Sequence, residues 1–203
     1  MAAVTVKTLD ASAVAEAAAA IGPHIRRTPT EKSEALSGLA GREVYLKLEN
    51  LQKTGSFKIR GALNALMNKD EAERANGVVT ASAGNHGQGV AFAAKLLGIP
   101  ACVVLPIGVP LAKLTAIQRA GAETVLTGES YDEAHAAALE IARERKRSYV
   151  HAFDDDDVIA GQGTLALELL DNAPDLDTLV VPDTLVLPDT TRDHPDSGGP
   201  IDH

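Results

Sequence analysis

The sequence has little cysteine, little positive charge and no long apolar run. Cys102 is the only cysteine among 203 residues, so no internal disulfide can form and a reducing compartment fits best. It lies within an apolar run, which is typical of a buried packing residue rather than a nucleophile. The formal charge of −9 argues against a nucleic-acid partner or an anionic membrane, because an acidic surface repels both.

The apolar stretches are also too short to span a membrane, since a spanning helix needs about 20 apolar residues. The Ala-rich stretch near the N-terminus is preceded by Lys7 and Asp10 and interrupted by Glu16. This pattern is typical of a capped amphipathic helix and not of a signal peptide. We therefore expect a cytoplasmic protein with no membrane partner and no nucleic-acid partner.

Short apolar runs alternate with amphipathic segments along most of the chain. Strands are predicted at residues 44–47, 77–80, 101–105, 124–126, 148–150 and 178–181. Helices are predicted at residues 10–21, 33–39, 59–67, 85–97, 110–120, 131–145 and 159–170. Strands that alternate with helices of this length imply right-handed crossovers and a mostly parallel sheet. The predicted fold class is α/β, with parallel strands and flanking helices.

A polar, loop-forming segment leads into the helix predicted to begin near residue 59. It ends in Ser-Phe-Lys-Ile-Arg-Gly, which places Lys58 beside the N-terminal end of that helix. The positive end of the helix dipole lowers the pKa of a nearby amine. A lysine must be neutral to attack an aldehyde, so this placement suits a Schiff-base lysine. Taken alone, however, such a lysine is more often an exposed surface residue.

A second segment, residues 80–89, reads Thr-Ala-Ser-Ala-Gly-Asn-His-Gly-Gln-Gly and joins a predicted strand to a predicted helix. Backbone N–H groups at such a junction form an anion site at the carboxyl end of a parallel sheet. The glycines also resemble a permuted dinucleotide-binding fingerprint. That site needs an acidic residue after the next strand, and residues 105–108, Leu-Pro-Ile-Gly, offer none. The nucleotide interpretation is therefore rejected.

Together, the lysine segment over residues 47–61 and the Gly-Asn-His segment resemble the motifs of fold-type II pyridoxal-phosphate enzymes, in particular the threonine dehydratase and serine racemase group. The similarity extends over about residues 8–182. It implies a tryptophan-synthase-β-like fold that is incomplete at the C-terminus. The implied domains are residues 1–76 as the first part of a large domain, 77–151 as a small α/β domain, 152–182 as the return segment of the large domain, and 183–203 as a disordered tail.

The resemblance implies pyridoxal 5'-phosphate as the cofactor and gives roles to individual positions. Lys58 would bind the cofactor aldehyde and act as the catalytic base, with Phe57 near the pyridine ring and Asn85 bonded to the phenolic oxygen. The substrate carboxylate would be received by Ser82, Asn85 and His86. No metal site is expected, because the acidic run at residues 154–157 reads as a solvated turn and helix start.

Position 83 of the substrate-binding loop distinguishes members of the group. The racemases that the motif resembles place a serine there, which protonates the opposite face of the carbanion. This chain has Ala83, whose methyl group exchanges no proton. The resemblance therefore favours elimination, in which a lyase of amino-acid metabolism converts threonine or serine into a 2-oxo acid and ammonia. A homodimer is the usual assembly in this family.

The end of the sequence departs from the family pattern. Residues 177–182 and 183–188 are near-identical copies, and residues 189–203 are polar and rich in Pro and Gly, which is typical of disorder. The glycine-rich loop that holds the cofactor phosphate in the family is missing after the strand at 178–181. We therefore expect either a truncated threonine or serine dehydratase, or an inactive fragment or non-catalytic assembly partner of a full-length relative. A cysteine-synthase-like enzyme is a weaker alternative.

Overall fold

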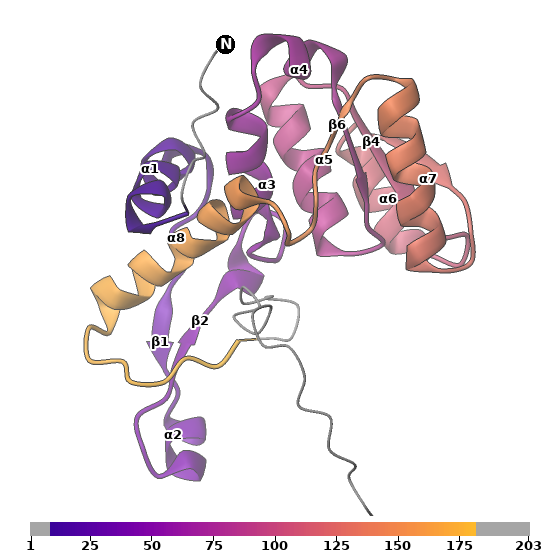
Figure 1. The fold of residues 1–203 in the computed structure, drawn as a ribbon. Coiled ribbons are helices and arrows are strands. Elements are labelled where there is room, and N and C mark those ends of the chain that lie inside the picture. Colours follow the sequence, from indigo (N-terminus) through magenta and orange to yellow (C-terminus); the bar gives the residue numbers. More distant parts are fainter. Residues whose placement is uncertain (1–8, 182–203) are drawn as a thin grey trace, which may run out of the picture.

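The computed structural model describes residues 9–181 (Figure 1), and the structural statements below concern those residues. Its helices are α1 (Ala11–Ile21), α2 (Glu34–Ala40), α3 (Lys58–Met67), α4 (Glu71–Asn76), α5 (Asn85–Leu97), α6 (Leu111–Arg119), α7 (Tyr131–Glu144) and α8 (Asp156–Asn172). Its strands are β1 (Thr30–Lys32), β2 (Tyr45–Lys47), β3 (Val78–Ala81), β4 (Ala101–Leu105), β5 (Glu123–Leu126) and β6 (Ser148–Tyr149). Short 3-10 turns are η1 (Gly22–His24) and η2 (Glu49–Leu51).

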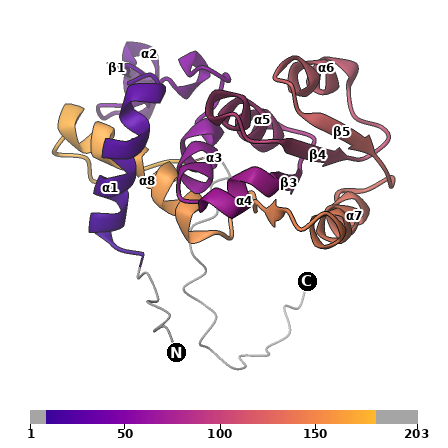
Figure 2. The ribbon, with the colours of Figure 1, turned by 90° about the horizontal axis from the view of Figure 1, so that it is seen from above.

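Four strands form a parallel sheet in the order β5-β4-β3-β6, which confirms the predicted α/β class. The two central strands, β3 and β4, are buried at every position, as expected for strands covered on both faces. Helices α5 and α6 cover one face and α7 covers the other (Figure 2). Cys102 points into the core beneath α7 and is fully buried, which confirms its predicted packing role.

Helices α1, α3 and α8 pack against one another beside this sheet, and α3 also packs against α5 (Figure 1). The closest approach of α3 to α8 uses two glycines. A methyl group on Gly61 would lie 2.6 Å from the carbonyl oxygen of Val158, and one on Gly161 would lie 2.5 Å from that of Arg60. Real side chains do not approach so closely, so both positions require glycine. The crossing fixes α3, which begins at Lys58, against α8.

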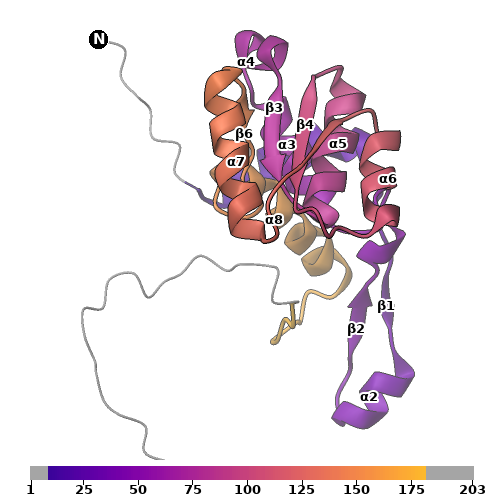
Figure 3. The same cartoon turned by 90° about the vertical axis from the view of Figure 1, so that its right-hand side faces the viewer.

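The antiparallel pair β1 and β2, together with α2, extends away from the rest of the molecule (Figure 3). Strand β1 and helix α4 were not predicted from the sequence. Helix α4 has a detectable signal, a capping box in which Asp70 and Glu73 each accept a hydrogen bond from the other's backbone N–H group.

The strand predicted at residues 178–181 is wrong. These residues adopt no strand, and the side chains of Leu179 and Val180 are 58% and 89% exposed. An apolar run becomes a strand only where a neighbouring strand accepts its backbone hydrogen bonds, and no described strand lies alongside this run. The predicted disordered tail at 183–203 lies outside the described residues. Within them, no helix is both long enough and apolar enough to cross a membrane.

Candidate active site

Lys58 is the first residue of α3, which begins one residue before the predicted start and keeps the lysine at the N-terminal end of the helix. Its side chain is buried, and its Nζ lies 3.3 Å from the carbonyl oxygen of Ala152. The Phe57 ring lies beneath the same amine, with its centroid 5.1 Å from Nζ. Burial lowers the pKa of Lys58, because removing an ammonium from water disfavours its charged form. A larger fraction of this amine is therefore neutral at pH 7 than for an ordinary lysine.

The Gly-Asn-His segment joins β3 to α5 at the carboxyl end of the parallel sheet. The Ser82 Oγ accepts a hydrogen bond of 3.2 Å from the Gly84 N–H group, which tightens the turn. Gly84 is the N-cap of α5 and has no side chain, so among the described residues the first N–H groups of the helix receive no side-chain cap. These N–H groups lie at the positive end of the helix dipole, where the sequence predicts an anion site. The Asn85 side chain is exposed and that of Ala83 is half-buried.

Two glycines bring this loop and the lysine together. A methyl group on Gly87 would lie 2.7 Å from the Ser82 carbonyl oxygen, so the first turn of α5 sits directly on the end of β3. A methyl group on Gly89 would lie 3.2 Å from the backbone carbonyl of Lys58, so the next turn of α5 packs against the start of α3. Two of the three glycines of the rejected nucleotide fingerprint, Gly87 and Gly89, are therefore close-packing positions, whereas Gly84 has open space around it.

A third segment, residues 150–152 after β6, completes the site and was not identified from the sequence. The carbonyl oxygen of Val150 accepts a hydrogen bond from the Thr80 hydroxyl at 2.9 Å and lies 3.3 Å from His86 Nε2. Two residues later, the carbonyl of Ala152 faces Lys58. Residues 150–152 contribute backbone carbonyl groups, which every residue type has, so their identities gave no signal. Their place at the carboxyl end of a parallel strand was the one available signal.

His86 is buried, and burial together with the charges of Lys58 and His151 lowers its pKa to about 4. Because the Val150 carbonyl can only accept, the neutral imidazole carries its proton on Nε2 and leaves Nδ1 as an acceptor. Nδ1 has no hydrogen-bond partner among the described residues. In this neutral form Nδ1 cannot donate a hydrogen bond, so the predicted contact of His86 with a substrate carboxylate requires a second proton on the ring.

The acidic run at residues 154–157 is a helix start, as predicted. Asp155 caps α8 by accepting hydrogen bonds from the N–H groups of Asp157 and Val158. In the described part of the chain, no group of three or more His, Cys, Asp or Glu side chains is arranged to hold a metal ion.

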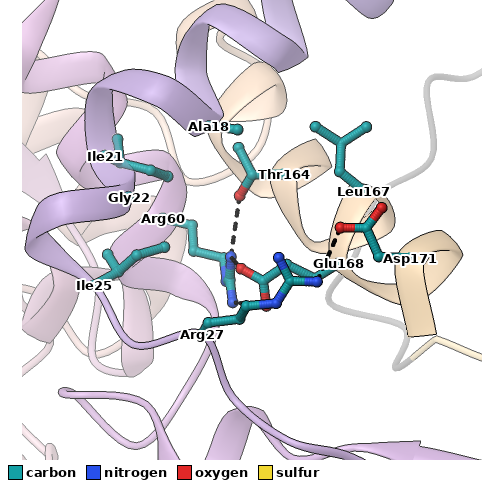
Figure 4. A pocket seen from close by; sticks show the side chains of 10 residues that line it. All are labelled: Ala18, Ile21, Gly22, Ile25, Arg27, Arg60, Thr164, Leu167, Glu168 and Asp171. Atoms are coloured by element: carbon teal, nitrogen blue, oxygen red, sulfur yellow. Dashed lines mark hydrogen bonds and ion pairs between the residues drawn. The ribbon is translucent and has the colours of Figure 1, made fainter.

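A cavity of about 380 Å³ lies away from Lys58, between α1, α3 and α8 (Figure 4). Arg60, Thr164 and Glu168 meet on one side of it, and an ion pair of 2.9 Å between Arg27 and Asp171 crosses its rim. Its charged groups are paired with one another, which is typical of a structural network rather than a ligand site.

Comparison with known proteins identifies the relatives of this chain. An L-threonine ammonia-lyase of Thermotoga maritima is 52% identical over 158 residues, which cover 78% of this chain and 39% of that protein. The structure of maize serine racemase matches with a TM-score of 0.80 and 36% identity, covering 83% of this chain and 51% of that one. The processed form of threonine deaminase isoform 2 from Solanum lycopersicum matches with a TM-score of 0.75 and 37% identity, covering 82% of this chain and 47% of that one.

The chain thus spans about half or less of the length of the proteins it matches. Residues 21–183, most of the sequence, match the family model described as pyridoxal-phosphate dependent enzyme. The match includes the buried lysine, the glycine-rich turn into α5 and the parallel sheet that holds them. The chain belongs to the pyridoxal-phosphate dependent enzyme family.

Proposed function

We propose that this chain carries the reactive lysine and the carboxylate-binding loop of a threonine or serine dehydratase, an ammonia-lyase. The observation that carries the proposal is the buried Lys58 amine with its lowered pKa, packed beside the N-terminus of α5. The threonine ammonia-lyase and threonine deaminase relatives support this reaction class.

The side chains near Lys58 fit the aldehyde end of pyridoxal phosphate. Two buried polar atoms, Ser56 Oγ and His86 Nδ1, have no hydrogen-bond partner among the described residues, which suits a site that receives a polar ligand. Phe57 would contact the ring and Asn85 its phenolic oxygen. The described residues after α8 contain no glycine-rich loop, so the phosphate end of the cofactor is unmatched in this part of the chain.

Pyridoxal phosphate, when bound, supplies an electron sink for the charge left at the substrate Cα. Lys58 Nζ would hold the cofactor through its aldehyde and would accept the α-proton of the substrate. The backbone N–H groups at the start of α5 hold the carboxylate, with the Ser82 hydroxyl beside them. Neutral His86 keeps this loop against Val150.

Ala83 favours elimination over racemisation in this proposal. It stands at the start of the loop into α5, and its methyl group can neither give nor take a proton. The relatives include both a threonine ammonia-lyase and a serine racemase, so overall similarity alone does not separate the two reactions. We therefore propose loss of the β-hydroxyl of threonine or serine, with a 2-oxo acid and ammonia as products.

The domain boundaries, assembly and compartment are proposals as well. All four strands of the parallel sheet lie within residues 77–151, which supports a small α/β domain there. Helices α1, α3 and α8 pack together outside it, which supports residues 1–76 and 152–182 as parts of a large domain. The family resemblance supports a homodimer, and the single buried cysteine suits the cytoplasm.

Cofactor trapping tests the central assignment. The 203-residue chain would be mixed with pyridoxal phosphate, reduced with borohydride and digested, and the modified lysine located by mass spectrometry. We expect modification at Lys58, its loss in Lys58→Ala, and no effect of Lys53→Ala, an exposed lysine in the same loop. Absence of a Lys58 adduct would refute cofactor binding by this chain and favour the inactive fragment or assembly partner.

Turnover tests the reaction class separately. With L-threonine or L-serine added to the cofactor-treated chain, we expect a 2-oxo acid that is detectable as its hydrazone and is absent in Lys58→Ala. A Lys58 adduct without any 2-oxo acid would contradict the dehydratase assignment while leaving the lysine assignment intact.

A further inference from the structure

His151 closes a tight turn directly after β6. Its Nδ1 accepts hydrogen bonds from the backbone N–H groups of Phe153, at 3.3 Å, and of Asp154, at 2.8 Å. An asparagine or aspartate side chain commonly closes a turn in the same way, by accepting from the backbone two or three residues ahead. Because Nδ1 accepts, the imidazole is neutral with its proton on Nε2.

This turn lies between the two carbonyl groups that contact the site. The residue before His151 is Val150, whose carbonyl faces His86, and the residue after it is Ala152, whose carbonyl faces Lys58. The two hydrogen bonds to Nδ1 close a ring of backbone that includes the Ala152 peptide group. The direction of the Ala152 carbonyl therefore depends on whether this ring is closed.

The His151 ring also packs against other rings. It meets the Phe153 ring edge-on with centroids 4.5 Å apart, and its centroid lies 6.0 Å from those of His135 on α7 and Tyr149 on β6. The ring contacts and the acceptor atom are thus two separate contributions of one side chain, and substitutions can separate them.

We propose that His151 is a positioning residue for Lys58: its neutral imidazole accepts the N–H groups of Phe153 and Asp154 and thereby holds the Ala152 carbonyl against the lysine amine. The consequence for catalysis rests on the proposed function, whereas the turn itself does not. No other residue in the described part of the chain accepts these two N–H groups.

The positioning depends on pH. A proton on Nδ1 removes the acceptor, so the turn opens as His151 is protonated. Burial lowers the pKa of His151, and this keeps the turn closed to lower pH than an unperturbed histidine would allow. Charged or titratable groups face the ring from four segments: His86 on α5, His135 on α7, Tyr149 on β6, and Asp154 and Asp155 before α8. The histidines oppose its protonation and the aspartates favour it.

Two substitutions separate acceptor from ring. His151→Asn keeps a side-chain acceptor at turn-closing distance without the ring, and its amide does not titrate between pH 4 and 7. His151→Phe keeps the ring contacts but has no acceptor. If the acceptor atom positions Ala152, the turn stays closed in His151→Asn and opens in His151→Phe. If ring packing positions Ala152, the turn stays closed in His151→Phe and opens in His151→Asn.

Amide hydrogen exchange measures the turn without any cofactor. We expect exchange at Asp154 to accelerate about two- to tenfold in His151→Phe, the scale of one lost hydrogen bond, and to stay near the wild-type rate in His151→Asn. After correction for intrinsic exchange, wild-type protection should fall on acidification below pH 6.5, whereas protection in His151→Asn should not change. Equal exchange in both variants, or faster exchange in Asn than in Phe, would overturn the proposal. If His151→Phe fails to fold, the proposal is tested by comparing the pH dependence of Asp154 amide protection in wild type and in His151→Asn.

Borohydride trapping of pyridoxal phosphate then links the turn to Lys58. We expect the cofactor concentration for half-maximal Lys58 labelling to rise about three- to tenfold in His151→Phe and to stay within twofold in His151→Asn. If hydrogen exchange shows that the turn is open in His151→Phe but trapping at Lys58 is unchanged, the positioning of Lys58 by His151 is refuted. If the wild-type chain does not trap the cofactor, the proposed function is refuted. The exchange measurement would still show whether the His151 acceptor closes the turn.

Discussion

Arg60 is fully buried, and removing it is the most informative test of what holds the lysine helix in place. All five of its N–H groups are satisfied. Nε and Nη2 donate to Glu49 at 2.9 and 2.8 Å, Nη1 and Nη2 donate to Glu168 at 2.8 and 3.1 Å, and Nη1 donates to Thr164 at 3.2 Å. Such fork-shaped pairing with a carboxylate is the strongest geometry available to arginine.

The network around Arg60 is electrically balanced. Lys47 donates to Glu168 at 2.6 Å, so two cations face two carboxylates. The four side chains come from β2, η2, α3 and α8, and Figure 4 shows Arg60 and Glu168 meeting beside α8. The carboxylate side chains are only 11% and 13% exposed, so water cannot replace a lost partner well.

Arg60→Met keeps most of the side-chain stem. Among the described partners it leaves Glu49 with the Thr28 hydroxyl and Glu168 with Lys47. Removing one partner from a buried ionic network costs about 3–5 kcal/mol. A domain has a total free energy of unfolding of about 5–15 kcal/mol, so the variant should be near the limit of folding. Adding Glu49→Gln should recover part of the loss, because it removes one of the stranded charges.

Urea unfolding followed by circular dichroism measures this cost. The matched control is Arg143→Ala, which removes an exposed pair with Glu140 and should change the free energy of unfolding by less than about 1 kcal/mol. If Arg60→Met and Arg143→Ala unfold at the same urea concentration, the network contributes no net stability. Recovery by Glu49→Gln must also appear if stranded charge is the cause.

The same network predicts a pH dependence. Burial raises the pKa of Glu168, but hydrogen bonds from Arg60 and Lys47 lower it further than burial raises it, so the net pKa is below its ordinary value of 4.5. A carboxylate with a lowered folded-state pKa contributes stability above its unfolded pKa and loses it as the pH falls through the folded one. The free energy of unfolding should therefore decline below about pH 4.5 in wild type, and decline less in Glu168→Gln.

Three further predictions concern the lysine site. Gly89→Ala should destabilise the chain by about 1–3 kcal/mol and weaken cofactor trapping, because its methyl group would press on the Lys58 backbone. As a control, Gly38→Ala lies in open space within α2 and should stabilise the chain by about 0.5–1 kcal/mol. Urea midpoints of both variants check this. Ala83→Ser should convert L-serine into D-serine that chiral chromatography detects. If no D-serine forms, residue 83 does not determine which reaction occurs. Acetylation of Lys58 should rise with pH at a midpoint below the roughly 10.4 of an ordinary lysine, because burial lowers its pKa, and a midpoint at that value would contradict its lowered pKa.

The helices and central strands could be predicted because their signals are local. Asp10 caps α1 by accepting from the N–H groups of Ser12 and Ala13, and Gly98 ends α5 in the left-handed conformation. The apolar run at β4 matches its predicted bounds of residues 101–105. In each case residues within a few positions determine the backbone conformation, so hydrophobic periodicity and capping residues are sufficient to predict the element.

The elements that could not be predicted depend on distant partners. Strand β1 is three residues long and exists because β2 pairs with it, while the apolar run at residues 178–181 has no described strand to pair with and forms none. The partners of Arg60 show the same limit: Glu168 lies 108 residues away in the sequence, and no spacing rule joins the two. Pairings of this kind are fixed by the packing of α3 on α8 and become visible only in the folded chain.

The opposite treatment of two neighbouring cations explains how the start of α3 can be both rigid and reactive. Residues two positions apart on a helix point in nearly opposite directions, so Lys58 and Arg60 meet different surroundings. Burial opposes the charge on Arg60, but its hydrogen bonds to Glu49 and Glu168 outweigh burial and raise its pKa, so it stays charged and anchors the helix. Lys58 faces the carbonyl of Ala152, and burial lowers its pKa. Arg60 anchors the helix through its own ion pairs with Glu49 and Glu168, so a loss of this anchor should reach Lys58 through two residues of backbone.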